Sequence, residues 1–143
     1  MRPRIFVIED DESSRRLLTL VLESRGYEVL SAAEPGLCPI YTDPNARCTH
    51  EFACGDFLLT DNRMPRMTGL EFVARQSERG CKGVVHNKAV FSGTWNAEEK
   101  ETALRLGCKT FTKPYDTGAI FHWLQEREKT LPPDRKLAAL SEL

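Results

Sequence analysis

Short apolar runs alternate along most of this chain with segments in which apolar residues recur at helical spacing. Five apolar runs, bounded by charged or turn-forming residues, predict buried strands at residues 4–9, 27–32, 56–61, 88–93 and 110–114. Helical spacing between and after them predicts helices at residues 13–27, 67–80, 96–107 and 116–129. Strands that alternate with helices predict an α/β fold, in which helices cover both faces of a parallel sheet.

The predicted helices carry start and stop signals. Asn96 is expected to cap one helix, with Glu99 as its capping-box partner, and Asp116 is expected to cap the last. Gly26 and Gly107 stand where a left-handed residue ends a helix. The residues of the first helix expected to face the core are Leu17, Leu18, Val21 and Leu22.

Two segments do not follow this alternation. Residues 33–56 carry three prolines and two glycines without a clean period, so a regular helix is not expected there. Pro132 and Pro133 stop the last helix, and residues 131–143 follow as a short tail. The tail has the pattern of a short amphipathic helix, but a frayed end is the simpler interpretation. We therefore expect one domain at residues 1–130.

Length and composition narrow the class of protein. With 143 residues, 41% of them hydrophobic and 29% charged, the chain has the composition of a globular domain. A formal net charge of −1 does not favour nucleic acid as a partner. No apolar run is long enough to cross a membrane, and the first one is too short for a signal peptide, so we expect no membrane association and a cytoplasmic location.

Charged and hydroxyl side chains stand at the carboxyl ends of four predicted strands. Glu9 and Asp10 end the first strand, Asp61 the third, Ser92 the fourth and Lys113 the fifth. In parallel sheets, ligands bind beyond these ends. Neighbouring carboxylates repel each other unless a cation joins them, and Mg²⁺ prefers such oxygen ligands. The set favours phosphoryl transfer with Asp61 as the nucleophile, Lys113 as a point charge and Ser92 as a hydroxyl donor.

The chain resembles the receiver domains of two-component response regulators over residues 4 to about 129. The resemblance is carried by four motifs in order, VIEDDESSRR, LLTDNRMPRMTGLEF, VFSGTW and TKPYD. It implies a flavodoxin-like, doubly wound five-stranded sheet in the order 2-1-3-4-5. It also implies that Asp61 accepts the phosphoryl group with the help of Ser92 and Lys113. The Mg²⁺ ligands that it implies are Glu9, Asp10, Asp61 and the main-chain carbonyl of Arg63.

The resemblance also implies a signalling role. A histidine kinase or histidine phosphotransfer protein would dock near the first helix and phosphorylate Asp61. The domain would then signal to a downstream protein by a conformational switch and would catalyse only its own phosphorylation and dephosphorylation. The thirteen residues after 130 are too few for a DNA-binding unit, so a stand-alone receiver is expected. The sequence does not decide between a monomer and a homodimer through the fourth and fifth helices of the family pattern, here residues 96–107 and 116–129.

One departure from the family pattern concerns the aromatic residue that usually stands three positions before the lysine. Here this position is Thr110, and Phe111 follows it. Strand alternation predicts that Phe111 points into the core, while Thr110 and Thr112 point to the opposite face. The usual aromatic switch is therefore in doubt.

A second departure is the cysteine content of residues 33–56. Cys38, Cys48, His50 and Cys54 have the residue types of a tetrahedral Zn²⁺ site, although their spacing matches no standard motif. A disulfide or redox role and inert, buried thiols are the alternatives. Cys54, Cys81 and Cys108 are expected at the sheet edge opposite the acids, where strand spacing puts Cys54 too far from Cys108 for a disulfide.

Two rival functions remain. A haloacid-dehalogenase-like phosphohydrolase would carry a second aspartate two residues after its nucleophile, and Arg63 occupies that position. Alternatively, the chain would be a receiver-like interaction module in which the cysteine segment senses metal or redox state and phosphorylation is vestigial. The intact acids and Lys113 argue against the loss of phosphorylation.

Overall fold

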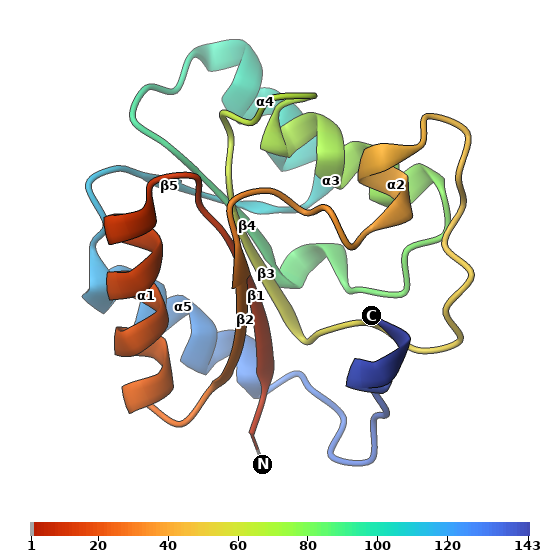
Figure 1. Ribbon diagram of the computed structural model, residues 1–143. Coiled ribbons are helices and arrows are strands. Elements are labelled where there is room, and N and C mark those ends of the chain that lie inside the picture. The colour runs from red at the N-terminus through yellow and green to blue at the C-terminus, as the bar shows by residue number, and fades with distance from the viewer. Residues whose placement is uncertain (1) are drawn as a thin grey trace.

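Five parallel strands form the centre of the structure, a computed structural model that describes residues 2–143 (Figure 1). Their order in the sheet is β2-β1-β3-β4-β5, which confirms the predicted flavodoxin-like topology. All four neighbouring pairs are parallel, so the carboxyl ends of the strands share one edge. The strands are β1 (Arg4–Ile8), β2 (Glu28–Ala32), β3 (Phe57–Asp61), β4 (Lys88–Ser92) and β5 (Lys109–Thr112).

Helices lie on both faces of the sheet (Figure 1). One face is covered by α1 (Glu12–Ser24) and α5 (Thr117–Glu128). The other is covered by α2 (Pro39–Thr42), α3 (Gly69–Glu78) and α4 (Ala97–Leu106). Two 3₁₀ helices, η1 (Val85–Asn87) and η2 (Leu140–Glu142), complete the structure. Within residues 2–143, no helix has both the length and the apolar character that crossing a membrane requires.

Alternation along the strands divides the core into two clusters. In β3, Phe57 and Leu59 pack beneath α1 and α5, whereas Leu58 packs towards α3 and α4. Every residue of β3 is buried, as expected for the central strand of a sheet with both faces covered. Asp61, the last residue of this strand, is therefore placed where the core meets the ligand-binding edge.

Most helix boundaries follow their sequence signals. The capping box of Asn96 and Glu99 is present at the start of α4, and Asp116 accepts from the main chain of Ala119 at the start of α5. Gly26 and Gly107 both have positive φ. One expected core residue was wrong, because Leu17 on α1 is 61% exposed. Leu18 and Leu22, one helical turn apart, form the buried stripe, and Leu17 lies outside it.

The segment between β2 and β3 is largely irregular, as its composition predicts. Its single helix, α2, has four residues and begins after Cys38. Ile40 and Tyr41 of this helix are buried, and Tyr41 packs edge-on against Phe72 of α3. The rest of the segment, residues 43–56, is a long connection without regular secondary structure apart from a single bridge residue, Ala53.

The tail is packed against the domain, in contrast to the frayed end expected from sequence. Leu137 forms a parallel bridge with Ala53, and the main-chain N–H of Ala138 donates to the carbonyl of Ala53 at 2.8 Å. The Arg135 guanidinium pairs with the buried carboxylate of Asp56. Figure 1 shows the end of the tail beside the connection that leads into β3.

Candidate functional site

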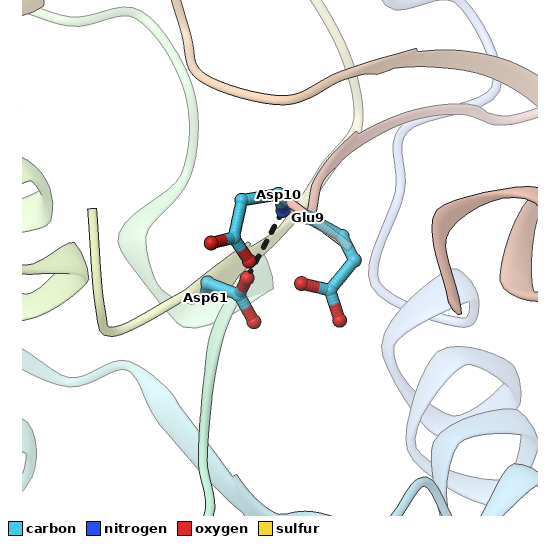
Figure 2. Close-up of side chains that lie close together, drawn as sticks. All are labelled: Glu9, Asp10 and Asp61. Carbon is cyan, nitrogen blue, oxygen red and sulfur yellow. Dashed lines mark hydrogen bonds between the residues drawn. The ribbon is translucent and has the colours of Figure 1, made fainter. Parts of the chain in front are cut away.

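Three acidic side chains meet at the carboxyl edge of the sheet. Glu9 and Asp10 directly follow β1, and Asp61 ends the neighbouring β3. Figure 2 shows the three carboxylates side by side, and one ligand oxygen from each lies within 4.8 Å of the other two. Glu9 and Asp61 are buried, whereas Asp10 is exposed. The third acid of the run, Asp11, instead caps α1 by accepting from the main chain of Ser14.

Lys113 joins this group from the end of β5. Its Nζ lies 2.6 Å from Oδ1 of Asp61 and 2.9 Å from Oε1 of Glu9. The backbone continues the sheet as far as this residue, because the N–H of Lys113 donates to the carbonyl of Ser92 at 2.8 Å. The lysine therefore bridges the two buried acids, as the sequence predicts.

Tyr115 is a member of the site that the sequence reasoning did not select. Its hydroxyl donates to Oε1 of Glu9 at 2.6 Å, so this oxygen is contacted by both Tyr115 and Lys113. The signal available in the sequence was its position two residues after Lys113, inside the TKPYD motif. Phe91 packs edge-on against the Tyr115 ring and helps to fix it.

This environment shifts the pKa values of the two buried acids in opposite directions. Burial raises the pKa of Asp61, and the neighbouring Glu9 raises it further, to about 7. Burial also acts to raise the pKa of Glu9, but hydrogen bonds with Asp61, Tyr115 and Lys113 outweigh it and lower that pKa to about 2. The pKa of Lys113 is raised, because contacts with Asp61 and Glu9 outweigh the opposing effect of burial. One lysine therefore does not fully compensate two buried carboxylates.

The site fits a divalent cation. Oδ1 of Asp61 is buried beside the Lys113 ammonium but has no aligned hydrogen-bond donor among residues 2–143. Its other oxygen accepts weakly, at 3.3 Å, from the N–H of Asp10. Carboxylate oxygens are the hard ligands that Mg²⁺ prefers. Because Asp10 is exposed, water can also reach the site, and Mg²⁺ keeps several waters when it binds proteins.

The Ser92 hydroxyl is engaged by its own loop and not by the acids, and Arg63 follows Asp61 in the connection to α3. Ser92 ends β4, the neighbour of β3, but its hydroxyl donates to the carbonyl of Thr94 at 2.7 Å. A rotation of its side chain is needed before it can donate elsewhere. Arg63 is exposed and lies two residues after Asp61, in the connection to α3.

A chain of contacts connects this edge to the start of α4. Asn62, which follows Asp61, is buried and donates to Oε2 of Glu99 at 3.1 Å. The other carboxylate oxygen of Glu99 accepts from the main chain of Asn96 and so forms half of the capping box. The first turn of α4 is therefore bonded to the residue next to Asp61.

The structure confirms the expected placement of Phe111. It pairs with Phe91 in the sheet and stacks on its ring, within the cluster beneath α1 and α5. Thr110 pairs with Val90, which belongs to the opposite cluster. Trp95 also packs in that opposite cluster, and its indole N–H donates to the carbonyl of Phe111 at 2.9 Å. An aromatic ring thus approaches β5 on this face, although it comes from the connection after β4.

The four residues considered for zinc lie apart from the acids. Cys38, Cys48, His50 and Cys54 line one cavity, between β1 and β2 on one side and the irregular segment on the other. All five cysteines of the chain are free thiols in the structure.

Comparison with known proteins identifies the family. Residues 5–125 match the family of response regulator receiver domains. The chain belongs to this family. It is therefore a receiver domain of two-component signalling, a signalling domain rather than a classical enzyme.

Relatives of this receiver domain differ in length. An uncharacterized 14.6 kDa protein of Leptolyngbya boryana is 30% identical over 134 residues, which are 91% of this chain and 93% of the relative. The transcriptional regulatory protein FixJ of Azorhizobium caulinodans is 31% identical over 117 residues, which are 81% of this chain but 50% of FixJ. The receiver domain thus spans one relative almost completely and half of the other.

Solved structures agree with this assignment. A CheY-like receiver domain protein of Methanospirillum hungatei has a TM-score of 0.66 and 27% identity, and the match covers 92% of this chain and 100% of that one. Full-length FixJ of B. japonicum has a TM-score of 0.70 at 21% identity, over 93% of this chain and 61% of that one. The second likeness supports the fold alone.

Proposed function

We propose that this receiver domain accepts a phosphoryl group on Asp61 in a Mg²⁺-dependent reaction and passes the signal to a protein partner. The observation that carries the proposal is the contact of Lys113 with both buried acids, at 2.6 Å from Asp61 and 2.9 Å from Glu9. A cation beside a nucleophilic carboxylate at an accessible sheet edge is what the transfer of an anionic group requires.

The chemistry assigns each residue one task. A carboxylate oxygen of Asp61 attacks phosphorus, the P–N bond of a phosphohistidine breaks, and the imidazole leaves with the bonding electron pair. Lys113 offsets the charge on the phosphoryl oxygens, and Ser92 donates to one of them after its hydroxyl leaves Thr94. Glu9, Asp10, Asp61 and the carbonyl of Arg63 would hold Mg²⁺, which supplies further positive charge at the phosphoryl group when bound.

Two surfaces support the proposed partners. Leu17 and Leu20 of α1 are 61% and 57% exposed, close in sequence to the acidic run at Glu9, and offer an apolar docking surface for a histidine kinase or histidine phosphotransfer protein. The contact from Asn62 to Glu99 offers a path by which phosphorylation biases the start of α4. The surface around the edge strand β5, with α4 on one side and α5 on the other, is then the one that a downstream protein, or a second copy, binds.

The proposal is tested by labelling the purified chain with radioactive acetyl phosphate in the presence of Mg²⁺. Wild type is expected to take up label, and Asp61→Asn is expected to take up none, because an amide cannot form the acyl phosphate. Asp134→Asn is the matched control, since Asp134 is an exposed aspartate in the tail. This variant should label like wild type, and chelation of Mg²⁺ should abolish labelling in both.

Two outcomes would contradict the proposal. Equal labelling of Asp61→Asn and wild type would exclude Asp61 as the acceptor. A folded wild type that takes up no label with Mg²⁺ present would favour a module in which phosphorylation is vestigial. A dehalogenase-like phosphohydrolase is disfavoured, because the exposed Arg63 stands where such an enzyme carries its acid catalyst.

A further inference from the structure

Four cysteines from different parts of the chain line the same cavity. The cavity has a volume of about 160 Å³ and lies on the α2–α4 side of the sheet, away from the acids. Cys38 precedes α2, Cys48 and Cys54 belong to the connection into β3, and Cys81 follows α3. All four are half-buried free thiols. Sequence spacing alone did not group Cys81 with Cys38 and Cys48.

Main-chain contacts hold the segments that carry these cysteines together. The N–H of Cys48 donates to the carbonyl of Arg79 at 2.9 Å, which ties the irregular segment to the end of α3, two residues before Cys81. The N–H of Cys81 donates to Gln76 of α3 at 3.0 Å. Cys54 is tied to the start of β1, because the Arg4 guanidinium donates to its carbonyl at 2.9 Å.

The thiols are close enough to influence each other electrostatically. Burial raises the pKa of Cys54, and the thiols of Cys38, Cys48 and Cys81 raise it further, to about 11. Cys38 responds in the same way, since burial first and then Cys81 and Cys48 raise its pKa.

An independent observation is a buried lysine that faces the same cavity. Lys88, the first residue of β4, is 4% exposed and lines the cavity. Its ammonium contacts Oε1 of Gln76 at 2.8 Å and Sγ of Cys81 at 3.3 Å. Among residues 2–143, no carboxylate lies within ion-pair distance of it. A buried cation without an anionic partner is costly, so an anionic group in the cavity would stabilise it.

We propose that Cys38, Cys48, Cys54 and Cys81 form a tetrathiolate site for Zn²⁺, with Lys88 as the buried counter-charge. Four thiols lose their protons to solvent when they bind the ion, so the filled site carries a net charge of −2, and Lys88 offsets part of it. Soft sulfur ligands select Zn²⁺ over Mg²⁺, so this site and the acidic site do not compete for one ion.

The thiols have to move towards one another when the ion binds. Among residues 2–143, the three acids are the only set of three candidate ligands whose atoms all lie within 4.8 Å of one another. A tetrahedral site with Zn–S bonds of about 2.3 Å is tighter than the present arrangement. All four cysteines lie outside helices and strands, where rotation of side chains and small shifts of the backbone are least restricted.

The site explains how a segment without a regular helix keeps a defined position. Among residues 43–56 only Asp56 is buried, and α2 has only four residues. Long irregular connections of this kind are commonly mobile unless another group fixes them. An ion bound both by this segment and by Cys81 would cross-link the segment to the end of α3. The hydrogen bond from Cys48 to Arg79 joins the same two parts of the chain.

The test is the zinc content of the purified full-length chain, measured by mass spectrometry of the metal. Wild type is expected to hold about one Zn²⁺ per chain, and Cys38→Ser, Cys48→Ser, Cys54→Ser and Cys81→Ser are each expected to hold close to none. Cys108→Ser is the matched control, because Cys108 is half-buried and free but does not line the cavity. It should retain the metal.

His50→Ala separates this ligand set from the set that the sequence suggests. His50 also lines the cavity, so both sets are within reach. The tetrathiolate site predicts that His50→Ala retains zinc and Cys81→Ser loses it. The reverse pattern would overturn the assignment of Cys81.

Two measurements on wild type do not depend on the folding of any variant. Co²⁺ added in place of Zn²⁺ should give the intense sulfur-to-cobalt charge-transfer band of a tetrahedral thiolate site. Zn²⁺ should also protect four of the five thiols from alkylation in the folded protein. A wild type that binds neither ion, with thiols that react equally with and without Zn²⁺ or that pair as disulfides, would overturn the proposal.

Lys88→Met tests the counter-charge. The substitution keeps the length and the apolar stem of the side chain but removes the ammonium. Zn²⁺ affinity is expected to fall about 10–100-fold, the usual effect of losing a group that supports metal ligands. A purely structural role of Lys88 would leave the zinc affinity of the folded variant unchanged. Because the acidic site lies elsewhere, acetyl phosphate labelling of this variant should be retained.

Discussion

At the scale of single residues, the central feature is a carboxylate kept in the core for its chemistry. Asp61 is 3% exposed and shares the ammonium of Lys113 with Glu9. Two buried acids that share one cation are unfavourable for the fold, because one negative charge stays uncompensated. The same excess of negative charge favours a bound cation, so the cost to stability and the proposed binding of Mg²⁺ have one cause.

Asp61→Asn is expected to stabilise the Mg²⁺-free protein at neutral pH. Burial and Glu9 raise the pKa of Asp61 from 3.8 in the unfolded chain to about 7 in the fold, so the folded state holds the proton more tightly. Wild type therefore loses stability as the pH rises from about 4 to 7, whereas the asparagine variant does not have this loss. We expect a gain of about 1–3 kcal/mol in the free energy of unfolding at pH 8.

Urea denaturation at pH 5 and pH 8 measures this effect. The difference between variant and wild type should be smaller at pH 5, and saturating Mg²⁺ at pH 8 should also reduce it by stabilising wild type alone. An asparagine variant that is less stable than wild type at both pH values would show that Lys113 compensates Asp61 fully.

At the scale of elements, the start of α3 packs directly against the end of β3. A Cβ atom added to Gly69, the first residue of α3, would lie 2.4 Å from the carbonyl oxygen of Asp61 and 3.0 Å from Val90. The N–H of Gly69 also donates to the carbonyl of Asn62 at 2.7 Å. This glycine therefore lets the helix and the strand approach closely enough to fix the position of Asp61.

Gly69→Ala is expected to destabilise the fold by about 1–3 kcal/mol, because the added methyl group meets main-chain atoms that cannot move aside. Gly118→Ala is the matched control. Gly118 lies in the first turn of α5, where a Cβ atom would have ordinary contacts, so alanine should stabilise by up to about 1 kcal/mol. Urea denaturation of both variants measures the difference. Equal stability of the two variants would contradict the close approach of α3 and β3.

At the scale of the whole molecule, the tail contributes to the stability of the domain. Arg135 pairs with Asp56, whose side chain is 1% exposed, and both oxygens of that carboxylate accept from the guanidinium. Asp56 also accepts from the N–H of Arg4, so the tail, the connection into β3 and β1 meet at one carboxylate. The end of the chain, Leu143, lines the same cavity as the four cysteines.

Arg135→Met is expected to destabilise the protein by about 3 kcal/mol. This is the lower end of the cost of breaking a buried ion pair, because Arg4 still donates to Asp56. Lys136→Met, next to it and exposed, should change stability little. Thermal unfolding of both variants provides the measurement. A melting temperature of Arg135→Met equal to that of the control would show that the tail does not stabilise the domain.

The sequence by itself determined the fold class and the order of elements along the chain. Local signals sufficed, because strand length, helical periodicity and caps such as Asn96 and Asp116 act over a few residues. The resemblance to receiver domains implied the strand order, and parallel strands in that order bring Asp61 and Lys113 together at their carboxyl ends. Phe111 followed from alternation in the same way.

Only the tertiary structure decided the contacts that join segments without a period of their own. Cys81 joins Cys38, Cys48 and Cys54 because the end of α3 lies against the irregular segment, and no spacing in the sequence encodes that approach. The docked tail depends in the same way on Asp56 at the start of β3. Long-range packing of irregular chain depends on the shape of the finished core, whereas helices and strands depend mainly on their own residues.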